Sequence, residues 1–153
     1  IEHASLVDDE GIRLAAARKR PVWFSMDIYN TDYTQAEGKK NGVLEDNLRK
    51  DREIAEAQRE NFRRAHRAGV KMVYGTDAGI YPHGDNAKQF AVMVRYGMSP
   101  LDAIRSATLN AAEALGRKDV GVLEAGRWAD LIAVDGDPLA DVSVLERVDA
   151  VVK

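Results

Sequence analysis

Two histidines, His3 and His83, and one aspartate, Asp77, have the types and positions suited to metal binding or proton transfer. His3 follows the short start Ile1-Glu2, and Asp77 lies in Gly75-Thr76-Asp77-Ala78-Gly79, directly after an apolar run. Imidazole nitrogens and carboxylate oxygens bind divalent metals, and a carboxylate also accepts a proton from water. Enzymes built on parallel strands place such groups where the strands end. The pattern therefore indicates a site for metal binding or proton transfer.

Each of these residues also has an explanation without chemistry. Asp77 is as consistent with capping the next turn as with binding a metal, since Gly75 and Gly79 free the backbone in both cases. A lone histidine such as His3 is more often structural than a ligand. His83, in the same loop as Asp77, fits a metal ligand or substrate contact and an exposed loop residue equally well. His66 lies in a highly charged helical stretch, and we assign it no role.

The elements that must position these residues alternate between helix and strand. We expect helices at residues 6–19, 44–68, 86–96 and 99–115, and strands at residues 22–26 and 70–74. The clearest helix start has Ser99 as the cap, Pro100 at the first helical position and Asp102 three residues after the cap. This alternation predicts a parallel α/β fold.

Residues 27–42 are predicted to form a long polar loop. The segment carries Tyr29, Asn30, Asp32 and Tyr33 and is unusually long for a tight connection. Loops of this length in compact α/β domains are either functional or disordered, and the sequence leaves both readings open.

The character of the chain changes after Gly116. Short apolar runs at residues 120–123, 129–134 and 148–152 are separated by glycines and predict three small antiparallel strands. We therefore divide the chain into residues 1–119, with helix-strand alternation, and a β-rich segment at residues 120–153.

Composition sets the outer limits on function. The chain has 153 residues, 45% of them hydrophobic and 31% charged, which is ordinary for a globular domain. The 22 basic and 25 acidic residues give a formal charge of −3, and no block of like charge suggests a nucleic-acid or membrane partner. The sequence contains no cysteine, which excludes disulfides and thiolate metal sites. The chain starts without methionine, so we expect its natural start to lie upstream, and localisation stays open.

Several motifs in a fixed order resemble the metal-dependent amidohydrolase superfamily. They are Ile1-Glu2-His3, Gly75-Thr76-Asp77-Ala78-Gly79, Pro82-His83-Gly84, residues 107–116 and Gly126-Arg127-Trp128-Ala129-Asp130-Leu131. The resemblance covers essentially the whole chain. Within the superfamily the sequence is most similar to Xaa-Pro dipeptidase-like and imidazolonepropionase-like hydrolases.

This resemblance implies a fold and a set of roles. The fold would be the C-terminal portion of a (β/α)8 barrel, strands six to eight with their helices, followed by strands of a small β-sandwich. His3 would follow strand six and bind metal, and Asp77 would follow strand eight, bind metal and act as the catalytic proton acceptor. His83 and Tyr29 would contact substrate. The implied cofactor is a divalent metal, with zinc expected and two ions in the intact enzyme. The implied substrate is a dipeptide or N-acyl amino acid.

The chain departs from the superfamily by lacking the ligands of strands one, four and five. A barrel of this type takes about 250 residues, and a catalytic zinc uses three protein ligands or more. We therefore expect a dipeptidase- or carboxypeptidase-like hydrolase that is active only with the missing N-terminal barrel segment. A cyclic-amide hydrolase or deaminase of the same superfamily is the second hypothesis. The third is a non-catalytic fragment that covers its open edges by self-association into a homo-oligomer.

Overall fold

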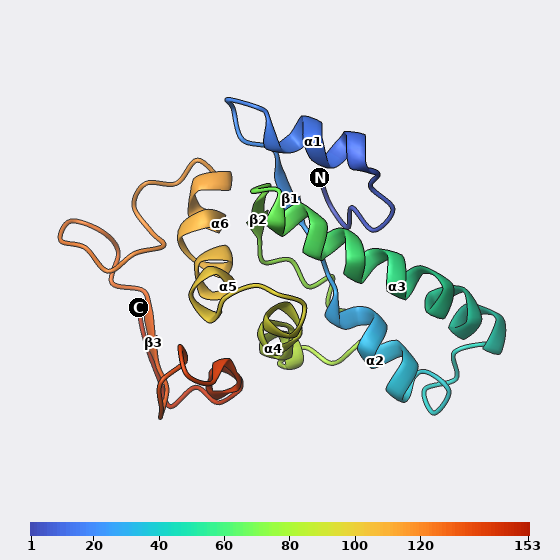
Figure 1. Cartoon of the computed structure of the whole chain (residues 1–153). Coiled ribbons are helices and arrows are strands. Elements are labelled where there is room, and N and C mark those ends of the chain that lie inside the picture. Colours follow the sequence, from blue (N-terminus) through green and yellow to red (C-terminus); the bar gives the residue numbers. More distant parts are fainter.

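The computed structural model describes residues 1–153 and has a short parallel sheet between its helices (Figure 1). Strand β1 (Trp23–Ser25) pairs in parallel with β2 (Lys71–Val73), with Phe24 opposite Met72. The N-terminal segment adds to the other edge of β1 through a parallel bridge between Glu2 and Ser25. Three parallel segments therefore lie side by side, and the sequence-based expectation of parallel α/β structure is confirmed for this part of the chain.

Helices surround this sheet. The chain passes from β1 to β2 through two helices, so the two strands run in the same direction. The helical elements are α1 (Asp9–Ala16), α2 (Tyr29–Glu37), α3 (Glu45–Arg67), the 3-10 turn η1 (Asp85–Ala87), α4 (Lys88–Arg95), α5 (Pro100–Ala107), α6 (Leu109–Ala114) and a second 3-10 turn, η2 (Val142–Glu146). None of the helices combines the length and the apolar character needed to cross a membrane.

One apolar core joins the two strands to four of the helices. Phe24 of β1 and Phe62 of α3 are fully buried, together with Met93 of α4 and Ala103 of α5. Ile12 brings α1 into the same cluster. Each large side chain buried in this way stabilises the fold by about 1.5–3 kcal/mol. The core thus fixes the strands whose ends carry the polar residues described below.

The prediction of a loop at residues 27–42 is wrong, because residues 29–37 form α2. Thr31, on the buried side of this helix, donates a hydrogen bond to Gln58 of α3 across 3.2 Å. Asp32 forms ion pairs with Arg59 of α3 and Arg95 of α4. Asparagine, threonine and tyrosine are weak helix formers, so contacts with neighbouring helices decide the structure here.

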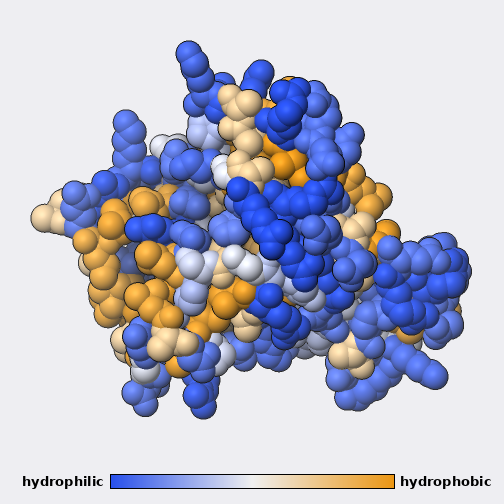
Figure 2. Space-filling view, viewed as in Figure 1, coloured by the Kyte–Doolittle hydropathy of each residue, from blue (hydrophilic) through white to orange (hydrophobic).

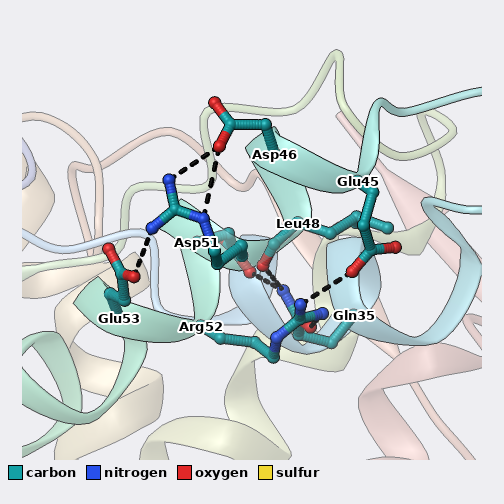
Figure 3. Close-up of polar contacts among 8 residues, drawn as sticks. Gln35, Glu45, Asp46, Leu48, Asp51, Arg52 and Glu53 are labelled. Atoms are coloured by element: carbon teal, nitrogen blue, oxygen red, sulfur yellow. Dashed lines mark hydrogen bonds and ion pairs between the residues drawn. The ribbon is translucent and has the colours of Figure 1, made fainter.

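A second set of polar contacts joins the C-terminal end of α2 to the N-terminal end of α3 (Figure 3). The side chain of Gln35 donates to the carbonyl of Leu48 across 3.1 Å and to the carboxylate of Asp51. Arg52 donates to Gln35 across 3.3 Å and pairs with Glu45 at 2.8 Å. These bonds hold α2 along α3 at a distance from the strand ends.

Two predicted helices are shorter or broken. The first covers residues 9–16 rather than 6–19, with Asp8 as its cap, accepting from the amide of Gly11 at 2.8 Å. The predicted helix at residues 99–115 starts as expected, since Ser99 accepts from the amide of Asp102 at 3.1 Å. It is then interrupted at Thr108, whose hydroxyl donates to the carbonyl of Ile104 at 2.9 Å. A hydroxyl that bonds back to the preceding turn competes with the helix ladder.

The C-terminal segment contains one two-stranded sheet. Strand β3 (Leu131–Ala133) pairs antiparallel with β4 (Ala150–Val152), with Ile132 opposite Val151, as the apolar runs predicted. The predicted strand at residues 120–123 is wrong. Gly121 has a φ of +89° and lies against the backbone of Thr108, a conformation that breaks an extended segment.

Apolar surface gathers on one side of the molecule (Figure 2). It lies over α5, α6 and the C-terminal sheet, whereas the far end of α3 and the loop before it are strongly hydrophilic. Trp128 is 61% exposed and Val151 is 73% exposed. Exposed apolar area of this kind indicates a surface that contacts another part of a protein.

Candidate metal centre

Three side chains from separate segments converge at the ends of the parallel strands. His3 follows the N-terminal bridge, Asp27 follows β1 by two residues, and Asp77 follows β2. One ligand atom from each lies within 4.8 Å of the others. Carboxyl ends of parallel strands meet at one edge of a sheet, so residues far apart in sequence come together there. The structure therefore brings together the two predicted ligands, His3 and Asp77, and adds a third residue.

Asp27 is held between His3 and the first turn of α2. Its Oδ1 lies 2.9 Å from Nδ1 of His3, and its Oδ2 accepts a hydrogen bond from Nδ2 of Asn30 at 2.7 Å. The side chain of Asp27 is only 10% exposed, whereas that of His3 is 55% exposed. The carboxylate therefore supports the imidazole from the protein side and leaves its other face toward solvent.

The surrounding carboxylates favour the protonated form of His3. The hydrogen bond to Asp27 and the negative charge of that carboxylate raise the pKa of His3, and Asp77 and Glu2 add to the effect. Partial burial acts in the opposite direction. The site is thus an anionic environment, which also attracts cations.

The backbone is strained at both predicted ligands. His3 has a φ of 61°, Ala4 a φ of 48° and Asp77 a φ of 46°. These are the only residues other than glycine with positive φ in the chain. Such conformations are costly for side chains with a Cβ atom, and they concentrate at functional sites. The strain coincides with the cluster and supports a functional role for it.

Gln89 of α4 ties the two strand ends together. Its side chain is fully buried, and its Nε2 lies 2.5 Å from the carbonyl of Gly75 and 3.4 Å from that of Met26. Its Oε1 accepts from the amide of Tyr29 at 3.5 Å. A single amide therefore links the residue before Asp27 with the loop that carries Asp77.

Tyr29 lies beside this edge but not in the three-residue cluster. Its ring packs against Tyr81, with centroids 4.8 Å apart, and against Tyr33 at 6.3 Å. Burial raises its pKa. Tyr29, Tyr33 and Pro82 are among the residues that line a groove of about 630 Å³ between α2 and α4, and the three residues of the cluster do not line it. Tyr29 is placed to shape a pocket, and its contact with substrate stays a prediction.

His83 is exposed in the loop after β2 and is not part of the cluster. Asp27, in contrast, was missed by the sequence reading. The signal existed, because Asp27 follows the predicted strand at residues 22–26 as Asp77 follows the strand at residues 70–74. Its assignment to a polar loop concealed that equivalence.

The donor set fits a divalent metal. Ligand atoms about 2.0–2.2 Å from one zinc ion lie roughly 3–4 Å apart, so donors within the observed range need only a small side-chain adjustment. One imidazole and one or two carboxylates are the ligand types that zinc accepts. His3 and Asp77 are the exposed members of the cluster, whereas Asp27 is buried.

Comparison with known proteins agrees with this geometry. The sequence matches the model of the Amidohydrolase family over residues 1–153. The chain belongs to the amidohydrolase family. This confirms the resemblance drawn from the ordered motifs. It also makes the strand-end cluster of this amidohydrolase chain the natural place to look for its chemistry.

Three relatives illustrate the similarity. A crystal structure of a Xaa-Pro dipeptidase with bound methionine in its active site superposes with a TM-score of 0.90 at 37% identity, over 100% of this chain and 38% of that one. Ochratoxinase from Aspergillus niger is 37% identical over 114 residues, 72% of this chain and 23% of the relative. Adenine deaminase 2 from Agrobacterium fabrum is 54% identical over 43 residues, 28% of this chain and 7% of the relative. This amidohydrolase chain therefore spans well under half the length of the proteins it matches.

Proposed function

We propose that this amidohydrolase chain is the C-terminal part of a longer metal-dependent hydrolase, called the parent enzyme below. The parent enzyme would cleave a peptide-like amide bond in a dipeptide or N-acyl amino acid, as a dipeptidase or carboxypeptidase does. The convergence of His3 and Asp77 at the strand ends carries the proposal. The similarity to a Xaa-Pro dipeptidase over the whole chain supports the choice of substrate class.

His3 and Asp77 would hold a divalent metal, for which zinc is the expected identity. Members of the superfamily are generally metal-dependent, and the intact site would contain two ions. When bound, such ions lower the pKa of a water molecule and polarise the carbonyl that it attacks. Two residues are too few for a catalytic zinc, so the other ligands would come from the preceding strands of the parent enzyme.

Asp77 would also move the proton in this reaction. Its carboxylate would accept a proton from the attacking water and deliver it to the nitrogen of the leaving amine. Asp77 is suited to this because it is exposed at the mouth of the site and stands on a strained backbone that the strand end and Gln89 hold in place. Tyr29, with Tyr33 and Tyr81, would form an apolar wall for the substrate side chain.

The direct test is turnover of the purified parent enzyme on a substrate panel. Xaa-Pro dipeptides, other dipeptides and N-acyl amino acids should be cleaved, and a chelator should abolish the activity. Asp77→Asn should reduce turnover by about 100-fold or more, the usual size of a proton-transfer contribution, and should leave the fold intact. Unchanged turnover in this variant would rule out the role of Asp77.

A deaminase or cyclic-amide hydrolase is the second candidate. The stretch of 43 residues that is 54% identical to adenine deaminase 2 favours it, although that stretch is a small part of both proteins. The attack of water on a trigonal carbon is common to all these reactions. Release of ammonia from adenine, or opening of a cyclic amide, by a parent enzyme that leaves dipeptides intact would select this candidate.

A non-catalytic fragment that self-associates is the third candidate. Its support is the exposed apolar surface, which includes Trp128 and Val151. The same surface equally suits association with an N-terminal barrel segment. Sedimentation of the 153-residue chain over a range of concentrations separates the cases. A clean monomer at every concentration would count against self-association.

A further inference from the structure

We propose that Asp27 is a positioning residue for His3. By accepting a hydrogen bond at Nδ1 of His3, it holds the imidazole so that Nε2 is the nitrogen that faces the metal. The inference deepens the proposed function and rests on it, because it takes His3 as a metal ligand. It assigns Asp27 a role through His3 and not a direct bond to the metal.

The two oxygens of Asp27 are already committed to protein partners. Oδ1 lies 2.9 Å from Nδ1 of His3, and Oδ2 accepts from Asn30 at 2.7 Å. A metal bound at this residue would have to share an oxygen with one of these partners. The side chain of Asp27 is also only 10% exposed, against 55% for His3, although one of its oxygens lies within 4.8 Å of the ligand atoms of His3 and Asp77. Both observations favour a supporting carboxylate over a third ligand.

Asn30 binds the other oxygen of the carboxylate and so restrains its orientation. Its side chain is buried, and its Nδ2 donates to Asp27 while its Oδ1 has no hydrogen-bond partner. The reversed amide would place its oxygen against the carboxylate oxygen, so the donating orientation is the favoured one. Asn30 lies in the first turn of α2, so this helix presents the amide to Asp27.

A neutral imidazole carries one N–H, and its hydrogen-bond partner decides which nitrogen carries it. A carboxylate next to Nδ1 draws the proton there and leaves the lone pair of Nε2 free. Partners of this kind orient metal-bound histidines, and their loss lowers metal affinity by about 10–100-fold. Asp27 supplies such a partner from a different strand, which also restricts rotation of the ring of His3.

The experiment measures metal affinity in the parent enzyme for Asp27→Asn, Asp27→Ala and His3→Ala. Zinc affinity, from competition with a chromophoric chelator, should fall by about 10–100-fold in Asp27→Ala. Asp27→Asn keeps an acceptor but not the charge, so its affinity should lie between those of Asp27→Ala and the unmodified enzyme. With cobalt bound at saturation in place of zinc, the visible absorption spectrum of both Asp27 variants should differ from that of the unmodified enzyme, because the imidazole of His3 is oriented differently.

Asp32→Asn is the matched control. Asp32 is a partly buried carboxylate on α2 that pairs with Arg59 and Arg95 rather than with His3. This variant should lower the free energy of unfolding and leave the zinc affinity and the cobalt spectrum unchanged. A purely structural role for Asp27 predicts the same behaviour for the Asp27 variants and would overturn the inference.

The remaining outcomes separate this inference from the proposed function. Loss of metal in Asp27→Asn as complete as in His3→Ala would make Asp27 a ligand and overturn the positioning role. Unchanged affinity in Asp27→Asn and Asp27→Ala, with loss in His3→Ala, would overturn the inference alone. Unchanged metal affinity in His3→Ala would overturn the proposed metal site itself.

Discussion

Gly75 lies so close to Ser25 that a Cβ atom at residue 75 would overlap the Oγ atom of Ser25. The Cβ atom added at residue 75 would also lie 3.3 Å from the Cβ atom of Ser25. Ser25 is the last residue of β1, and Gly75 follows β2 by two residues. Glycine at residue 75 therefore allows the ends of β1 and β2 to approach each other closely. This approach brings the segments that carry Asp27 and Asp77 together.

Replacement of Gly75 by alanine should force these strand ends apart. Overpacking of this kind costs about 1–3 kcal/mol, so Gly75→Ala should lower the free energy of unfolding by that order and should weaken metal binding. Denaturant unfolding and metal titration measure the two effects. Ser25→Ala alone should be nearly neutral, and in combination with Gly75→Ala it should recover part of the loss. Strictly additive effects in this double-mutant cycle would contradict the proposed contact.

Gln89 should contribute both to stability and to the site. In Gln89→Leu the carbonyls of Gly75 and Met26 lose a buried donor, and each unpaired group costs about 1–3 kcal/mol. Thermal unfolding should therefore shift to lower temperature, and turnover per folded molecule should also fall because the two strand ends are less well fixed.

Gln35→Leu is the control for this prediction. Gln35 makes comparable bonds to Leu48 and Asp51, but it joins α2 to α3 away from the strand ends (Figure 3). This variant should be destabilised without loss of turnover per folded molecule. If Gln35→Leu and Gln89→Leu lower turnover equally, Gln89 has no special relation to the site.

The sequence predicts most of the elements that form the core because their signals are local. The amphipathic pattern of α3, the cap of α5 at Ser99 and the apolar runs of β1 and β2 all depend on neighbouring residues. The structure confirms each of them within a few residues. The convergence of His3 and Asp77 was expected from the family resemblance, because spacing alone left both residues with structural explanations.

The features that the sequence does not predict depend on distant contacts. Helix α2 contains weak helix formers such as Asn30 and Thr31, and it is stabilised by α3 and α4. The role that we propose for Asp27 depends on its contact with Nδ1 of His3, 24 residues earlier in the chain, and the local sequence does not reveal this contact. The interruption at Thr108 reflects a side-chain bond to Ile104 that helical periodicity cannot reveal.

The pair of Arg117 and Asp119 gives a pH-dependent signature at the boundary between residues 1–119 and 120–153. Both guanidinium nitrogens that contact Asp119 lie 2.6 Å from its oxygens, and this pairing lowers the pKa of Asp119 to about 2. A carboxyl whose pKa is depressed stabilises the fold above its unfolded value of 3.8 and loses that contribution as the pH falls through about 2. The effect on stability should be small because the pair is exposed.

Carboxyl chemical shifts of Asp119, followed by NMR as the pH falls from 5 to about 2, measure this pKa directly. In Arg117→Gln the midpoint should rise toward the ordinary aspartate value. An identical midpoint for Asp119 with and without the arginine would show that the pair does not form in solution.

His83 should affect substrate binding more than metal binding. It is exposed in the loop that carries Asp77, but it lies outside the cluster of His3, Asp27 and Asp77. In the parent enzyme, His83→Ala should raise KM by about tenfold, the loss expected for one contact of about 1.4 kcal/mol, with zinc content unchanged. His66→Ala, on the last turn of α3, is the matched control and should alter neither quantity. Loss of zinc in His83→Ala would make His83 a ligand, whereas an unchanged KM would leave the residue without a role in substrate recognition.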